Sequence, residues 1–167
     1  MAEKSNTKLP VTSSAVARLL DDLKRLQEEP LIGANASPLE DNIMKWFGIV
    51  VGTEGTPYAG VPIRFVLEFG NNYPNEAPKA FFDSEVRYTG GATYKVDGRL
   101  AVCLNIFGNF GHVHTEWKSQ SEGWTPSYTV TTILLSMQAL MMQNMLSTTK
   151  SDIELTLNSA RNLKCKE

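Results

Sequence analysis

The sequence has little net charge, only two cysteines and no long apolar run. Its 167 residues include 16 Lys and Arg against 18 Asp and Glu, which gives a formal net charge of −2 at pH 7. Because a basic surface is what holds a phosphate backbone, we expect no nucleic-acid partner. The longest apolar stretch, residues 133–142, is interrupted by Ser136 and Gln138. It is too short to cross about 30 Å of hydrocarbon, so we expect no membrane segment in this chain.

The two cysteines, Cys103 and Cys165, are too few to stabilise a small disulfide scaffold. Residues 1–10 are polar and lack the apolar core of a secretory signal. Together these absences indicate a reducing compartment inside the cell, where both cysteines remain thiols. The 42% hydrophobic and 20% charged residues are typical of a globular protein, and the length fits one domain.

The N-terminal part of the chain shows a helical pattern. We expect residues 1–12 to be a flexible segment and residues 13–167 to form the single domain. Ser13 and Ser14 can cap a helix that Pro30 ends. Its apolar residues recur at helical spacing and are Val16, Leu19, Leu20, Leu23 and Leu26.

Three strands are predicted after this helix. Residues 33–40, rich in Gly, Asn, Ser and Pro, are interpreted as a turn. Runs of β-branched and aromatic residues then predict antiparallel strands over 43–51, 61–69 and 79–82. Residues 83–131 show almost no periodicity, and an irregular stretch of that length in a small domain is usually functional.

Two helices are predicted after the irregular stretch. Thr129 can cap a central helix from Val130 to about Met145. This helix is apolar on almost every side, which indicates that it is buried. A final, more polar helix is expected over residues 150–164.

Five short motifs occur in a fixed order along residues 13–146. They are Trp46; Gly52 with Thr56-Pro57-Tyr58-Ala59-Gly60; Tyr73-Pro74 with Ala77-Pro78-Lys79; Val102-Cys103-Leu104; and Trp124-Thr125-Pro126 ahead of Leu134-Leu135-Ser136. In this order the motifs resemble those of the ubiquitin-conjugating enzyme (E2) family. The resemblance implies an α+β, UBC-like fold with an N-terminal helix, a four-stranded antiparallel meander and a central helix. The helical region that follows would be shorter than in most members.

The resemblance also implies a chemistry for Cys103. This residue would accept ubiquitin, or a related modifier, as a thioester from an activating enzyme and pass it to a substrate lysine with a ligase. A cysteine suits this task because a thiolate is both a good nucleophile and a good leaving group. No metal or organic cofactor is needed. The implied partners are the modifier, the activating enzyme (E1), the ligase (E3) and a substrate protein.

One family signature is missing before the cysteine. Members usually carry His-Pro-Asn there, whereas Thr93 is the residue nearest to the signature Asn in this chain. In the family, that Asn stabilises the oxyanion of the transfer step or holds the active-site loop. Asn105 is a candidate substitute, because two residues beyond Cys103 in an extended segment it points to the same side. Asn105 could equally serve only to tie down the loop.

The resemblance assigns further residues to docking. Asn75, Pro126 and Ser127 would lie on the surface that meets the ligase. Arg18 is the basic residue left on the helix that the family uses to meet the activating enzyme. The acidic pair Asp21 and Asp22 follows it, so the cognate activating enzyme need not be the usual one for ubiquitin.

The interval of 21 residues between Cys103 and Trp124 is longer than in compact members and resembles the insertion of long-loop members. It contains His112 and His114, and no further Cys/His pair completes a zinc site at metal spacing. We therefore interpret both histidines as loop residues whose charge can respond to pH near the active site. Residues 107–123 are expected to form a mobile gate over Cys103.

Two alternatives to a ubiquitin carrier remain open. One is a non-catalytic scaffold of the same fold that binds ubiquitin or a conjugating partner. The other is a conjugating enzyme for another ubiquitin-like modifier. The phrase Pro38-Leu39-Glu40-Asp41-Asn42 and the tail Lys164-Cys165 are similar to the branch anchored in the endoplasmic reticulum. The expected location is the cytoplasm or nucleus, or the surface of the endoplasmic reticulum if a C-terminal anchor has been removed.

Overall fold

The computed structural model of the protein describes residues 13–86, 95–110, 123–142 and 149–164. Within these ranges the helices are α1 (Ser14–Glu28), α2 (Val130–Met142) and α3 (Lys150–Lys164). The strands are β1 (Ala34–Leu39), β2 (Asn42–Val51), β3 (Pro62–Glu68), β4 (Lys79–Phe82), β5 (Lys95–Val96) and β6 (Arg99–Leu100).

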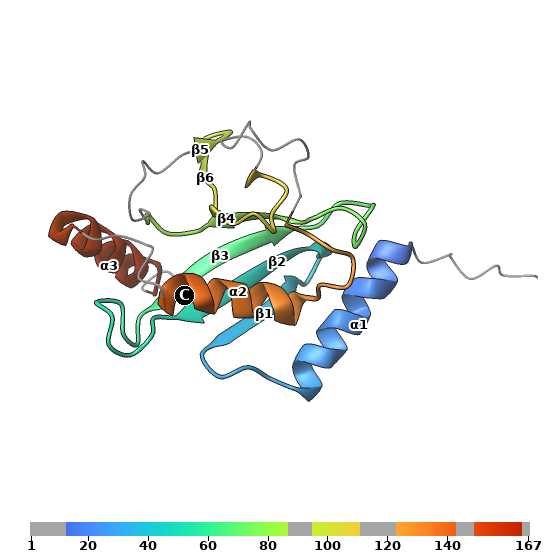
Figure 1. The fold of residues 1–167 in the computed structure, drawn as a ribbon, viewed down its shortest axis with the longest axis horizontal. Helices are drawn as coiled ribbons and strands as arrows, with labels where there is room; N and C mark the ends of the chain where they lie inside the picture. The colour runs from blue at the N-terminus through green and yellow to red at the C-terminus, as the bar shows by residue number, and fades with distance from the viewer. Residues whose placement is uncertain (1–12, 87–94, 111–122, 143–148, 165–167) are drawn as a thin grey trace, which may run out of the picture.

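The four longer strands form one antiparallel sheet in the order β1-β2-β3-β4. This confirms the predicted meander and the three strands that were expected for β2, β3 and β4. Figure 1 shows α2 lying across the sheet, with α1 beside its N-terminal end and α3 at the opposite end of the molecule. The core lies between α2 and the sheet, where α2 contacts β1 and β2.

The turn predicted for residues 33–40 is wrong, because Ala34–Leu39 is strand β1. Ala34 and Ala36 are buried, whereas Asn35 and Ser37, which alternate with them, are exposed. This is the period-two alternation of a half-buried strand. It was missed because the residues are small ones that also favour turns. Pairing with β2, in which Ala34 lies opposite Val50, makes this segment a strand and not a turn.

The irregular segment after β4 also contains structure that the sequence pattern did not indicate. Strands β5 and β6 form a two-stranded hairpin. Its turn residues Asp97 and Gly98 have φ angles of 51° and 76°. An Asp-Gly pair is the residue choice that a two-residue hairpin turn with positive φ favours. That dipeptide was the available signal for the hairpin that precedes Cys103.

The helices agree well with the predicted ones. Ser13 caps α1, since its hydroxyl accepts a hydrogen bond from the Val16 amide at 3.3 Å. The predicted final helix coincides with α3, and α2 begins at Val130 as expected. The expected burial of α2 holds for one side of the helix, whereas Leu135 and Met142 are 49% and 65% exposed. Among the described residues, no helix combines the length and hydropathy that crossing a membrane requires.

Candidate active site

Cys103 lies where the chain leaves the edge of the sheet. Just before it, Ala101 bridges Phe81 of β4, and the Val102 amide donates to the Ala80 carbonyl at 3.0 Å. The Leu104 amide then donates back to the Val102 carbonyl at 3.1 Å, so the backbone turns tightly at Cys103. Cys103 itself is half-buried. A cysteine on a tight turn beside a rigid strand is held in place while its side chain stays within reach of solvent.

The chain is attached to β4 again a few residues after Cys103. The side-chain amide of Asn109 donates to the Ala80 carbonyl and accepts from the Ala80 amide, both at 3.1 Å. The Gly108 amide donates to the Pro78 carbonyl at 2.9 Å. Asn109 is fully buried, and none of the sequence motifs includes it. The signal for it was an Asn inside the apolar run from Ile106 to Phe110.

Asn105 lies on the exposed side of this anchored turn. It packs closely against Gly123: a Cβ atom added to that glycine would lie 2.5 Å from Asn105 Cγ and 2.7 Å from its backbone oxygen. Only glycine fits at position 123 without a shift of Asn105. The contact supports the loop-anchoring role of Asn105, while its role as a donor stays a prediction. Thr93, His112 and His114 lie outside the described residues, as does the centre of the predicted gate.

Two loops approach each other next to this region. We name residues 70–78 the Tyr-Pro loop and residues 123–128 the Trp-Thr-Pro loop. The indole Nε1 of Trp124 donates to the Pro74 carbonyl at 2.7 Å, and the rings of Tyr73 and Trp124 lie 5.9 Å apart. The structure therefore brings the two loops that carry Asn75, Pro126 and Ser127 together, and all three residues are exposed.

Arg18 does not point freely into solvent as a docking cation. Its Nε donates to Asp22 Oδ1 at 3.0 Å, its Nη1 to the Pro126 carbonyl at 3.0 Å and its Nη2 to the Tyr128 carbonyl at 2.7 Å. The Asp22 side chain has no exposed surface, and its Oδ2 accepts a hydrogen bond from the Tyr73 hydroxyl at 2.6 Å. Burial, together with this bond to Asp22, raises the pKa of Tyr73 well above its usual value.

The Tyr73→Phe substitution is expected to lower the free energy of unfolding by about 1.5–3 kcal/mol, the usual value of a hydrogen bond to a charged group. Because the pKa of Tyr73 is raised in the folded state, its contribution is full below the unfolded value of about 10 and falls as the pH rises above it. Urea unfolding at neutral and alkaline pH measures both effects. Tyr128→Phe is the control, since the Tyr128 hydroxyl makes no hydrogen bond within the described residues. Equal stabilities of wild type and Tyr73→Phe would contradict the prediction.

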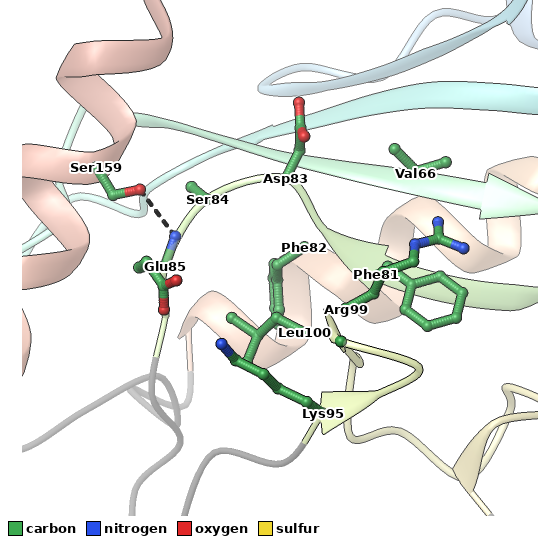
Figure 2. Close-up of a pocket in the computed structure, with 11 residues that line it drawn as sticks. Val66, Phe81, Phe82, Asp83, Ser84, Glu85, Lys95, Arg99, Leu100 and Ser159 are labelled. Carbon is green, nitrogen blue, oxygen red and sulfur yellow. Dashed lines mark hydrogen bonds between the residues drawn. The ribbon is translucent and has the colours of Figure 1, made fainter.

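A hollow of about 400 Å³ lies between the end of β4, the β5–β6 hairpin and α3. Arg99 of the hairpin stacks over the Phe81 ring at 3.7 Å and pairs with Glu68 at 2.8 Å. Figure 2 shows the neighbouring contact, in which the Ser159 hydroxyl of α3 accepts a hydrogen bond from the Glu85 amide at 2.8 Å. These contacts attach the hairpin before Cys103, and the chain leaving β4, to the sheet and to α3.

The described ranges contain no group of three His, Cys, Asp or Glu side chains arranged to hold a metal ion. His112 and His114 are not part of those ranges.

The comparisons with known proteins agree with one another. Residues 18–164 match the family model described as ubiquitin-conjugating enzyme. The chain is 35% identical over 131 residues to Ubiquitin-conjugating enzyme E2 2 of Candida albicans, which covers 78% of this chain and 63% of that protein. It is 34% identical to Ubiquitin-conjugating enzyme E2 2 of Aspergillus fumigatus, covering 78% and 75%.

The chain thus spans less than two thirds of the length of the Candida albicans relative. Its fold is similar to the solved structure of human Ubiquitin-conjugating enzyme E2 G1, with a TM-score of 0.61 and 23% identity, covering 79% of this chain and 98% of that one. This likeness confirms the predicted α+β, UBC-like fold. Because the family model matches most of its length, the chain belongs to the ubiquitin-conjugating enzyme family.

Proposed function

We propose that this protein carries ubiquitin, or a related modifier, as a thioester on Cys103 and transfers it to a substrate lysine with the help of a ligase. The observation that carries the proposal is the position of Cys103. It is a half-buried cysteine on a turn that β4 anchors on both sides, in a chain of this family. The activating enzyme, the modifier, the ligase and the substrate protein are the partners that the proposal requires.

The two steps exchange one acyl group. In the first, the Cys103 thiolate attacks the activated C-terminal carbonyl of the modifier, forms the thioester and displaces the activating enzyme's thiolate. In the second, a lysine amine attacks that carbonyl, the C–N bond forms, the amine nitrogen loses a proton to solvent, and the C–S bond breaks to release the Cys103 thiolate. A negative charge develops on the carbonyl oxygen as the amine attacks the thioester, so a positioned donor near Cys103 accelerates this step.

Incubation with a ubiquitin-activating enzyme, ATP and ubiquitin tests the proposal. We expect a band shifted by one ubiquitin on a non-reducing gel, which disappears on addition of thiol. Parallel reactions with other ubiquitin-like modifiers and their own activating enzymes test the second alternative. No adduct with any of them would instead support the non-catalytic scaffold.

The exposed residues of the two loops form the proposed ligase-docking surface. Asn75→Ala and Pro126→Ala are each expected to weaken ligase binding, because a few positions dominate such patches and one of them can contribute about 2 kcal/mol or more. Ligase-stimulated release of the modifier, titrated with ligase, measures the effect. Ser127→Ala serves as the third variant on the same surface. Unchanged titrations in all three variants would count against this surface.

The remaining assignments are part of the same proposal. Arg18 on α1 is proposed to face the activating enzyme, and residues 13–167 to act as one domain. The proposed location is the cytoplasm or nucleus, or the surface of the endoplasmic reticulum for a chain with a C-terminal anchor.

A further inference from the structure

Three segments that are distant in the sequence are joined in a closed ring of contacts. Helix α1 meets the Tyr-Pro loop where the Tyr73 hydroxyl donates to Asp22. That loop meets the Trp-Thr-Pro loop where Trp124 donates to the Pro74 carbonyl. The Trp-Thr-Pro loop returns to α1 through Arg18 (Figure 1 shows the chain passing from this loop into α2 close to α1).

Arg18 closes this ring with a directional set of bonds. Three of the five guanidinium N–H groups are used, one for the Asp22 carboxylate and two for the carbonyls of Pro126 and Tyr128. The two carbonyls flank Ser127, which is exposed together with Pro126. The guanidinium therefore holds the backbone on both sides of the residue that the loop presents to solvent.

Asp22 explains why the guanidinium is held in this position. The Asp22 side chain is fully buried and the Arg18 side chain is 22% exposed, so their 3.0 Å pair is largely shielded from water. The second carboxylate oxygen is bonded to Tyr73, which leaves the carboxylate satisfied at both ends. This pair fixes the orientation of Arg18, because rotation of the guanidinium would leave the buried Asp22 carboxylate without its positively charged partner.

We propose that Arg18 is the positioning residue of the ligase-docking surface: anchored by Asp22, it fixes the Pro126 and Tyr128 carbonyls so that Pro126 and Ser127 are presented in their binding conformation. The inference rests on the proposed function and goes beyond it, because that function assigns Arg18 to the activating enzyme. A loop that is ordered before binding loses less conformational entropy when a partner binds, so preorganisation raises affinity. Lysine cannot replace Arg18, since one ammonium nitrogen lacks the planar fork that reaches three acceptors.

The structural part of the inference is tested without any partner. Hydrogen exchange of the Tyr128 amide is the probe, because it donates to the Thr125 carbonyl at 3.0 Å within the loop. Arg18→Lys is expected to accelerate this exchange tenfold or more. Arg25→Lys is the matched control on the same helix: its pair with Asp21 at 2.9 Å has the same spacing but lies on the exposed surface. Circular dichroism confirms that both variants are folded. Equal exchange in Arg18→Lys and wild type would overturn the inference.

The functional part uses the charged protein and a ligase RING domain that accelerates discharge of the wild type to free lysine. Arg18→Lys is expected to raise the ligase concentration for half-maximal stimulation tenfold or more. The maximal rate and the rate without ligase are expected to stay at wild-type values. A general structural defect would lower these rates as well. Slower charging with an unchanged ligase titration would overturn the inference and assign Arg18 to the activating enzyme. If the wild type does not charge, the proposed function fails while the exchange experiment still decides whether Arg18 orders the loop.

Discussion

Cys103→Ser is expected to replace the thiol-sensitive adduct with ubiquitin by an oxyester that survives reducing agent and is cleaved by alkali. Cys103→Ala is expected to form no adduct at all, the largest effect that any single substitution in this chain can have on charging. The thiol and the hydroxyl differ in how readily they attack the activated carbonyl, and alanine has no nucleophile at all. A thiolate forms readily near neutral pH, whereas a serine hydroxyl is a weak nucleophile without an activating base.

The second cysteine supplies the control for this experiment. Cys165→Ser keeps Cys103 and is expected to charge at the wild-type rate, because Cys103 is the residue that lies on the turn anchored by β4. The measurement is the appearance of adduct over time on gels run with and without thiol. Charging that is lost in Cys165→Ser and retained in Cys103→Ser would show that Cys165, and not Cys103, carries the thioester.

Asn105→Ala is expected to slow discharge of the modifier to free lysine by roughly a hundredfold or more. The removal of one positioned donor to a developing oxyanion typically costs about 2.7–4 kcal/mol of transition-state stabilisation. Asn105 is exposed and follows Cys103 by two residues, on a turn and not in the extended segment that the sequence suggested, so its role as the donor rests on this proximity alone. Because the chain lacks the His-Pro-Asn signature, the wild type itself is expected to charge readily and to discharge slowly without a partner.

The close contact between Asn105 and Gly123 requires a control that separates donation from anchoring. Asn105→Leu has a similar shape and can pack against Gly123, but its side chain carries no charge and has no N–H group to donate. If donation matters, Asn105→Leu discharges at least as slowly as Asn105→Ala. If anchoring matters, Asn105→Leu discharges like the wild type and only Asn105→Ala is slow. Single-turnover discharge of both variants, with Thr93→Asn and Thr93→Ala, decides between these roles. A wild type that discharges fast and is insensitive to both positions would refute the oxyanion argument.

Local sequence patterns predicted the elements that depend on neighbouring residues. The start of α1 follows from the Ser13 cap and its end from Pro30, and α3 from its own helical periodicity. Strand β4 agrees residue for residue with the prediction, because prolines delimit it on one side. The order of motifs around Cys103 was sufficient to indicate the family, because those motifs are contiguous in the chain.

The ladder with β2 makes Ala34–Leu39 a strand despite its turn-like composition. Pairing between distant residues is a property of the folded chain, and local composition does not encode it.

The sequence by itself determined the class of fold, the family resemblance and the choice of Cys103. Tertiary structure alone decided the environment of Arg18, whose partners Pro126 and Tyr128 are 108 and 110 residues away. It also decided that Asn109 anchors the cysteine turn to Ala80, 29 residues earlier. Helical periodicity places Arg18 on a face of α1, but only the packing of two loops against that face makes it a half-buried cation whose direction three hydrogen bonds fix.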